Sequence, residues 1–285
     1  MELKEGLDTY AEITWCKGCG NFGILQSIKE SIQKLEEKGY KREDFAISAG
    51  IGCHGKIWGY LRLHGLYSLH GRPTATVQGM KIANPDLKVI AFSGDGDALG
   101  EGISHTIFAA KRNSDMTLVL HNNGVYALTT GQFAPTSEKG YVSPSSPEGN
   151  PEDPINPLIL MLSSNATFIA RVFPGKKEHM VKTIVKAIEH EGFSFVEVLQ
   201  PAVAYVNTWP LYNKNTEIIE DNGDNFERAM ELAKRKDKLS LGVIYQNEKK
   251  PPFHKAVYGD LHPIKDRLSH NDRIKKIDDI LNPSK

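Results

Sequence analysis

The chain has 285 residues, 25% of them charged and 40% hydrophobic, and its 35 Lys and Arg residues balance 35 Asp and Glu residues. The zero net charge disfavours a nucleic-acid-binding protein, which needs a basic excess or a basic stripe. No apolar run approaches the ~20 residues of a membrane-spanning helix, and the first residues lack the apolar stretch of a signal peptide. Three cysteines are too few for a disulfide framework, so we expect a cytoplasmic protein with no membrane contact.

Hydrophobic periodicity predicts alternating helices and strands. A helix is expected over 20–38, and FAISAGIGC (45–53) predicts a strand that runs into a glycine-rich turn. Continuous apolar runs at 87–94 and 116–123 predict strands buried on both faces, with a helix at 99–112 between them. Such a βαβ unit places its two strands as parallel neighbours, so the sequence predicts an α/β fold with a parallel sheet flanked by helices.

The second half of the chain is less regular. Residues 129–157 are rich in Gly, Pro and Ser and predict a long loop, a feature that is usually functional or disordered in a compact domain. A helix is expected at 176–190, followed by the strand FSFVEVLQ. After Pro210 the sequence becomes polar and charged, with a helix near 225–237 and one short strand, LSLGVIY. We interpret this part as a polar C-terminal arm that lies on the main domain or on a partner.

Polar residues follow both strands of the βαβ unit. The sequence GDGD (94–97) comes after the first strand and NN (122–123) after the second. Ligands of parallel sheets bind at the carboxyl ends of the strands, and the glycines would let the backbone approach a phosphate. Asp95 would repel a diphosphate unless a cation lay between them, and Mg²⁺ prefers such oxygen ligands. Each motif alone could be a simple turn, but the pair favours a Mg²⁺–diphosphate site with Asp95, Asn123 and a carbonyl such as that of Val125.

The cysteines form a second candidate site. Cys16, Cys19 and Cys53 each lie within two residues of a glycine in a predicted turn. They could hold zinc, form a redox pair or bind an iron–sulfur cluster, or Cys53 could be a buried apolar residue beside an incidental CxxC. An iron–sulfur cluster normally takes four thiolates and the chain offers three. His70 lies in a glycine-rich stretch suited to an anion, although a structural role is equally expected.

Several stretches, in order over residues 10–205, resemble the β subunit of archaeal and bacterial 2-oxoacid:ferredoxin oxidoreductases. They are WCKGCGNFGI (15–24), GIGCHGKI (50–57), LHGRPTATVQGMKIANPDL (69–87), FSGDGDALGEGISHTIFAAKRN (92–113), HNNGVYALTTGQFAPTS (121–137) and FVEVLQPA (195–202). The resemblance implies a thiamine diphosphate-binding fold with Mg²⁺ and a four-iron four-sulfur cluster. We assign these cofactors to a domain of residues 1–209, and we interpret the polar residues 210–285 as an arm that contacts another subunit.

The resemblance also implies roles for individual residues. Asp95, Asn123 and the carbonyl of Val125 resemble the Mg²⁺ ligands, and Cys16, Cys19 and Cys53 resemble the cluster ligands. The implied thiamine diphosphate contacts are Ile51, Gly52, Cys53, His54, His70, Gly96, Asp97, Ala127 and Leu128. Lys56 is placed to bind the carboxylate of a 2-oxoacid substrate.

The sequence departs from the family pattern at two positions. Ala202 stands where the fourth cysteine ligand is expected, and alanine cannot bind iron. The cluster then has three thiolates and another fourth ligand, or it is labile or lost. Thr130 stands where many relatives have a lysine, which could change the substrate preference or the cofactor contacts.

The expected function is oxidative decarboxylation of a 2-oxoacid with coenzyme A, giving acyl-CoA, CO₂ and reduced ferredoxin. An α subunit is expected to supply the activating Glu, so we expect the chain to have almost no activity alone. Pyruvate, 2-oxoglutarate and branched 2-oxoacids all remain open as substrates. The alternatives are a non-redox thiamine diphosphate enzyme, which has no use for the cysteines, and a scaffold or regulatory subunit that has lost its cluster.

Overall fold

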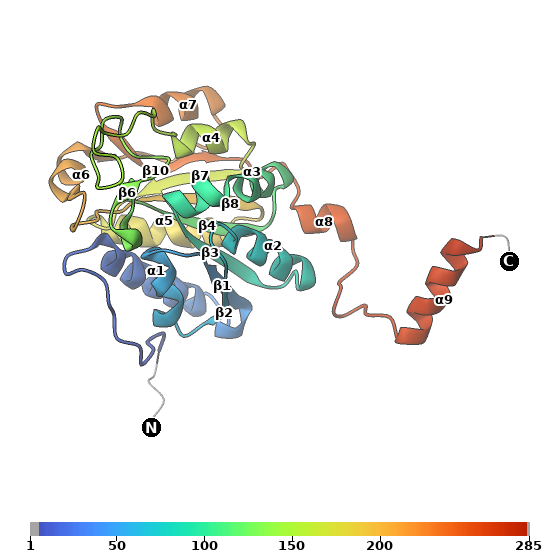
Figure 1. The fold of residues 1–285 in the computed structure, drawn as a ribbon. Coiled ribbons are helices and arrows are strands. Elements are labelled where there is room, and N and C mark those ends of the chain that lie inside the picture. The colour runs from blue at the N-terminus through green and yellow to red at the C-terminus, as the bar shows by residue number, and fades with distance from the viewer. Residues whose placement is uncertain (1–5, 284–285) are drawn as a thin grey trace.

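The computed structural model describes residues 6–283, in which an eight-stranded sheet lies between two layers of helices (Figure 1). The strand order is β2-β1-β3-β4-β8-β7-β10-β9. The strands are β1 (Phe45–Ala49), β2 (His64–Tyr67), β3 (Lys88–Gly94), β4 (Met116–Asn122), β7 (Phe168–Val172), β8 (Phe193–Leu199), β9 (Thr216–Ile218) and β10 (Leu239–Gln246). Neighbouring strands from β2 to β7 are parallel, whereas β10 is antiparallel to β7. The predicted α/β fold with a parallel sheet is confirmed.

Helices cover both faces of the sheet because alternate strand residues face opposite sides. Phe45 and Ile47 of β1 belong to one apolar core with α1 (Gly20–Glu37) and α5 (Lys177–Glu189). Ala46 of the same strand belongs to the other core. That second core includes residues of α2 (Pro73–Ala83), α3 (Ile103–Arg112), α4 (Pro157–Ser163) and α7 (Phe226–Lys234).

The predicted βαβ unit is present, with one change in its helix. Strands β3 and β4 are parallel neighbours, in register from Ile90 opposite Thr117 to Gly94 opposite His121. The helical path between them begins earlier than predicted, because a π-helix over Gly96–Glu101 precedes α3. Similarly, the first strand ends at Ala49, and the chain then turns into a 3₁₀ helix over His54–Tyr60.

The loop predicted at 129–157 carries the short strand β6 (Gln132–Phe133), which pairs with β5 (Val125–Tyr126) after a 3₁₀ turn over Ala127–Thr129. Strand β7, which the sequence pattern did not predict, carries a buried charged residue, Arg171, within its apolar run.

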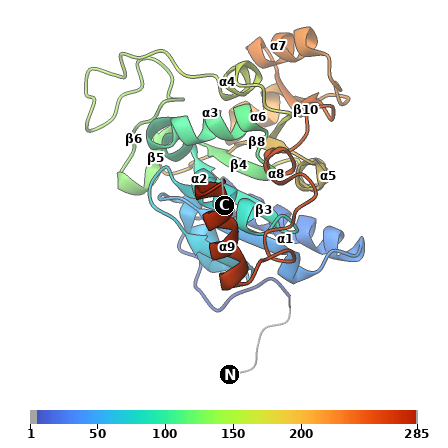
Figure 2. The same cartoon turned by 90° about the vertical axis from the view of Figure 1, so that its right-hand side faces the viewer.

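The polar C-terminal part divides into two regions. After α6 (Trp209–Asn215), strands β9 and β10 join the main sheet, so the sheet extends into the range that the sequence assigned to the arm. Beyond Gln246, the chain continues through α8 (Phe253–Tyr258) to α9 (His270–Leu281), which projects away from the sheet (Figures 1 and 2). None of the helices among residues 6–283 combines the length and apolar character needed to cross a bilayer.

The parallel topology gathers the site at one edge. Strands β1, β3, β4 and β8 are parallel, so their carboxyl ends lie together. The residues that follow these ends are Gly50, Asp95, Asn123 and Gln200.

Candidate functional site

Asp95 and Asn123, the predicted metal ligands, meet at the ends of β3 and β4. The Asn123 backbone N–H donates to Asp95 Oδ1 at 3.4 Å, and the Thr136 hydroxyl donates to Asp95 Oδ2 at 2.6 Å. The Asn123 side-chain oxygen accepts from the backbone N–H of Val125 at 3.0 Å. The structure therefore places the three predicted Mg²⁺ ligand residues side by side.

Burial dominates the electrostatics of Asp95, whose side chain is 1% exposed. Loss of solvent raises the pKa of this carboxyl to about 6, and the hydrogen bonds from Thr136 and Asn123 only partly oppose that rise. A cation beside the carboxylate would favour its ionised form. The protein groups around Asp95 therefore compensate only part of the cost of a negative charge at this position.

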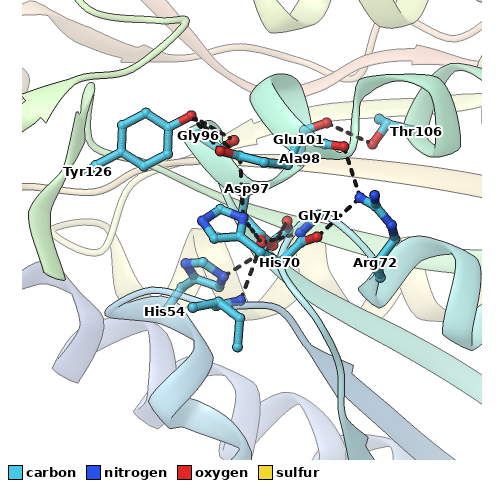
Figure 3. A network of polar contacts seen from close by, with 12 residues as sticks. His54, His70, Gly71, Arg72, Gly96, Asp97, Ala98, Glu101, Thr106 and Tyr126 are labelled. Atoms are coloured by element: carbon cyan, nitrogen blue, oxygen red, sulfur yellow. Dashed lines mark hydrogen bonds and ion pairs between the residues drawn. The ribbon is translucent and has the colours of Figure 1, made fainter. Parts of the chain in front are cut away.

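Asp97 is a buried junction that ties the loops of the site together (Figure 3). Its contacts are the backbone N–H groups of Ile51 and Gly71, the hydroxyl of Ser93, and the imidazoles of His54 and His70. The carboxylate oxygens lie 2.6 Å from Gly71 N, 3.0 Å from His70 Nδ1 and 3.3 Å from His54 Nε2. Burial favours a higher pKa for Asp97, but His54, Ser93 and Gly71 together lower it below the usual range. Both carboxylate oxygens of Asp97 already contact groups of the protein. The contact of Asp97 with a cofactor stays a prediction.

The two glycines of GDGD are required by side-chain packing. A Cβ at Gly94 would lie 2.7 Å from Nδ1 of His54, and one at Gly96 would overlap the ring of Tyr126. The sequence interpretation gave these glycines the role of letting a phosphate approach the backbone. The structure supplies another reason, which is that the rings of His54 and Tyr126 pack directly against them.

A cavity of about 170 Å³ joins residues that the sequence assigned to four different roles: cluster ligands, a magnesium ligand, cofactor contacts and a substrate contact. It is lined by Cys16, Cys19, Cys53, Lys56, Asn123, Ala127, Leu128 and Ala202, among others. The ammonium of Lys56 donates to Thr14 Oγ1 at 3.0 Å on the same wall. Thr130, the other departure from the family pattern, is exposed in the loop with a φ of 82° and does not line this cavity.

The remaining predicted cofactor contacts, Ile51, Gly52, His54, His70 and Gly96, lie around Asp97. Asn123 lines the cavity with the cysteines and contacts Asp95, which lies two residues before Asp97 in the chain. The Asp95–Asn123 pair is therefore connected to both groups of predicted site residues.

The three cysteines differ in their exposure to solvent. Cys16 is exposed, Cys53 is half-buried and Cys19 is buried. Burial raises the pKa of the Cys19 thiol to about 11 and also raises that of Cys53, which the charge of Lys56 partly opposes. Among residues 6–283, no set of three or more His, Cys, Asp or Glu side chains is arranged to hold a single metal ion. The thiols surround a cavity and do not converge on one centre.

Sequence reasoning missed a chain of buried and half-buried polar side chains that begins at Asp95. Thr136 also contacts Asn122 Oδ1 at 2.9 Å, and Asn122 donates to Glu197 at 2.7 Å. Glu197 in turn accepts from Arg171 Nε at 2.7 Å across β7 and β8. Arg171 and Glu197 were the available sequence signal, because each is a charged residue inside an apolar strand and such residues are rarely buried unless they are paired. This chain of contacts links Asp95 to the middle of the sheet.

Gln200 was also missed, although it lies within a stretch that resembles the family. Its side chain is 1% exposed and contacts both Asn123 and Cys19. A glutamine at a strand end has no distinctive sequence signal, so only the three-dimensional arrangement identifies it.

Known proteins match this chain over most of its length. Residues 50–198 match the family described as thiamine pyrophosphate enzyme, C-terminal TPP binding domain, and residues 204–259 match the C-terminal region of the pyruvate ferredoxin oxidoreductase beta subunit. A 2-oxoacid:ferredoxin oxidoreductase subunit beta from a Sulfolobus species is 36% identical over 94% of this chain and 94% of its own length. The chain belongs to this β-subunit family. The corresponding subunit of Saccharolobus solfataricus is 39% identical over 82% of each chain.

A solved relative has the same fold over nearly its full length. It is a 2-oxoglutarate:ferredoxin oxidoreductase from Magnetococcus marinus with 2-oxoglutarate, coenzyme A and succinyl-CoA bound. The TM-score is 0.85 at 33% identity, covering 95% of this chain and 94% of that one. The family resemblance and the oxidoreductase class predicted from the sequence are confirmed. The matched TPP-binding region, 50–198, contains Asp95 and Asn123.

Proposed function

We propose that this β subunit binds thiamine diphosphate and Mg²⁺ and, with an α subunit, carries out CoA-dependent oxidative decarboxylation of a 2-oxoacid with reduction of ferredoxin. The observation that supports it most strongly is the cavity that brings three thiols, Lys56 and Asn123 together. A metal–diphosphate site and an electron-transfer site are then adjacent, as this reaction requires.

The residues around Asp95 fit a magnesium diphosphate. Asp95, the Asn123 amide oxygen and the Val125 carbonyl are hard oxygen ligands, which Mg²⁺ takes together with substrate phosphates. Asp95 is buried with an incompletely compensated charge, and a bound cation would stabilise it. Thiamine diphosphate, when bound, supplies the electron-accepting ring that permits loss of CO₂ from a 2-oxoacid. The part of this chain is to bind and orient that cofactor, with Lys56 holding the substrate carboxylate.

The cysteine cavity fits a cluster with three protein thiolates. Ala202 lines the cavity with the three cysteines, so the fourth expected position is filled by a methyl group. A cluster spans a larger volume than a single ion, and thiols spaced around a cavity suit it better than they suit zinc. The cluster would then have one corner without a protein thiolate, and we expect it to be less stable than a four-thiolate cluster. Loss of the cluster in a scaffold protein is the alternative that Ala202 favours.

The exposed arm supports the need for a partner. On α9, the apolar side chains of Ile274, Ile277, Ile280 and Leu281 are 51% to 73% exposed. Such a row of apolar side chains is typical of a protein–protein contact. The relatives are named as β subunits, and we assign this contact to the α subunit.

The experiment is to purify the αβ complex anaerobically and measure its content of iron, acid-labile sulfide, Mg²⁺ and thiamine diphosphate. We expect all four, with iron lost when Cys16 is replaced by serine. Thiamine diphosphate without iron would favour the non-redox enzyme, and neither cofactor would favour the scaffold.

A further inference from the structure

Gln200 connects the two halves of the site. We propose that it is a positioning residue that couples occupancy of the Mg²⁺ site to the reduction potential of the cluster held by the three cysteines. This inference rests on the proposed function, because it assumes Mg²⁺ at Asn123 and a cluster at Cys19. The proposed function itself requires neither Gln200 nor any energetic coupling between the two sites.

The side chain of Gln200 uses both ends of its amide. Its Oε1 accepts a hydrogen bond from Asn123 Nδ2 at 2.7 Å, and its Nε2 lies 3.3 Å from Cys19 Sγ and donates to it. Nε2 also donates to the Pro201 carbonyl at 2.7 Å, and the Gln200 backbone N–H donates to the Asn122 carbonyl at 2.9 Å. The side chain is 1% exposed, so water does not compete for these contacts. One buried amide therefore bridges the two sites.

The contact with Asn123 fixes which atom faces the metal position. A carbonyl oxygen accepts only from the NH₂ group of an amide, so Gln200 holds Asn123 Nδ2 on its own side. The Val125 N–H contacts the other end, Asn123 Oδ1, at 3.0 Å. The two contacts agree on one orientation, in which the amide oxygen is presented as a metal ligand. Loss of either contact would let the amide turn.

The hydrogen bond from Gln200 to Cys19 allows the same amide to change the charge stabilisation at the Cys19 sulfur. Hydrogen bonds to cluster sulfurs stabilise negative charge there and so raise the reduction potential. A cation bound at Asn123 Oδ1 would polarise the Asn123 amide and strengthen its hydrogen bond to Gln200 Oε1. Hydrogen bonds in series polarise one another, so the Nε2–H of Gln200 would then donate more strongly to Cys19. Mg²⁺ binding would thereby favour the reduced state of the cluster.

Linkage makes the effect reciprocal, because two binding equilibria that share a coupling free energy change each other by the same factor. We expect Mg²⁺ to bind about tenfold more tightly to the reduced complex, which for a one-electron couple equals a shift of about 59 mV in midpoint potential. The cluster would thus be reduced more readily when the cofactor site is occupied than when it is empty.

The test uses the αβ complex of the wild type and of three variants, with iron and Mg²⁺ content measured first. The midpoint potential is then titrated by EPR with and without Mg²⁺ and thiamine diphosphate. Gln200→Leu removes both contacts, while Gln200→Glu keeps the acceptor for Asn123 and removes the donor to sulfur. Gln78→Glu is the matched control, because Gln78 lies on α2 and contacts Thr74 and Ser114, away from the site.

In the wild type and in Gln78→Glu we expect the potential to rise when the cofactors bind. In both Gln200 variants this shift should be lost, and Gln200→Leu should in addition bind Mg²⁺ about tenfold more weakly. A shift that persists in either Gln200 variant, or that is absent from the wild type, overturns the coupling. A wild-type complex without iron or without Mg²⁺ overturns the proposed function itself, and that result is visible before the titration begins.

Discussion

Replacing Asp95 by asparagine should separate the stability of this chain from its cofactor binding. The new amide would keep the buried hydrogen bonds, because its oxygen can accept from the Asn123 N–H and its NH₂ group can donate to Thr136. Thr136 would then donate to Asn122 Oδ1, which lies 2.9 Å away. The substitution therefore removes a buried charge with little loss of contacts.

The magnitude follows from the pKa of the carboxyl, which burial raises from an ordinary value of 3.8 to about 6. The folded chain holds this proton more tightly than the unfolded chain, so wild-type stability falls as pH rises through about 4 to 6 and stays lower above that range. The whole difference corresponds to at most roughly 3 kcal/mol. Asp95→Asn should thus be more stable than the wild type by up to this amount at pH 8, with the gap closing near pH 4.

The assay is urea denaturation of the chain at pH 4 to 8, first in EDTA and then with Mg²⁺ and thiamine diphosphate. Ligands that bind only the folded state raise the free energy of unfolding. We expect the cofactors to stabilise the wild type and to leave Asp95→Asn unchanged. If Asp95→Asn is less stable than the wild type at pH 8 in EDTA, the carboxylate does not carry the cost assigned to it and the reasoning is refuted.

The remaining predictions concern the second site, the polar chain and the arm. Ala202→Cys should raise the amount of iron that the complex retains in air, and Ala204→Cys, at another residue lining the same cavity, is the control. Equal iron retention in the two variants would show that the cluster corner without a protein thiolate does not face Ala202. Thr136→Val removes a hydrogen bond to a buried carboxylate and should weaken Mg²⁺ binding about tenfold by calorimetry. Thr117→Val, at a buried threonine whose hydroxyl donates to Ala187, should leave Mg²⁺ affinity unchanged. Deletion of residues 260–285 should abolish α-subunit binding in gel filtration and leave the urea midpoint unchanged, since none of residues 260–283 belongs to the apolar cores. Retained binding would assign α9 a role other than contact with the α subunit.

The central part of the fold could be predicted because its signals are local. Strands β3 and β4 are continuous apolar runs, and the polar motifs at their ends follow directly in the sequence. Their parallel pairing is fixed by the βαβ connection, and it brings Asp95 to Asn123. The family resemblance extended this local interpretation to the cysteines and to Lys56.

Other features could not be predicted because they depend on tertiary contacts. Strand β7 contains Arg171, whose charge is tolerated only because Glu197 lies opposite it on β8. The helix after β3 was placed too late, since glycines disfavour helices and only the surrounding contacts hold Gly96 in one. Gln200 and Thr136 are common residue types, and their roles follow only from what lies within hydrogen-bond distance.

The central claim is that this chain is one half of an electron-delivering thiamine diphosphate enzyme, and turnover tests it most directly. The measurement compares 2-oxoacid- and CoA-dependent reduction of ferredoxin by the αβ complex with that by this chain alone, each loaded with Mg²⁺ and thiamine diphosphate. We predict turnover by the complex and almost none by the isolated chain. Comparable turnover by the isolated chain would contradict the need for a partner, and CO₂ release by the complex without ferredoxin reduction would contradict the electron-transfer role.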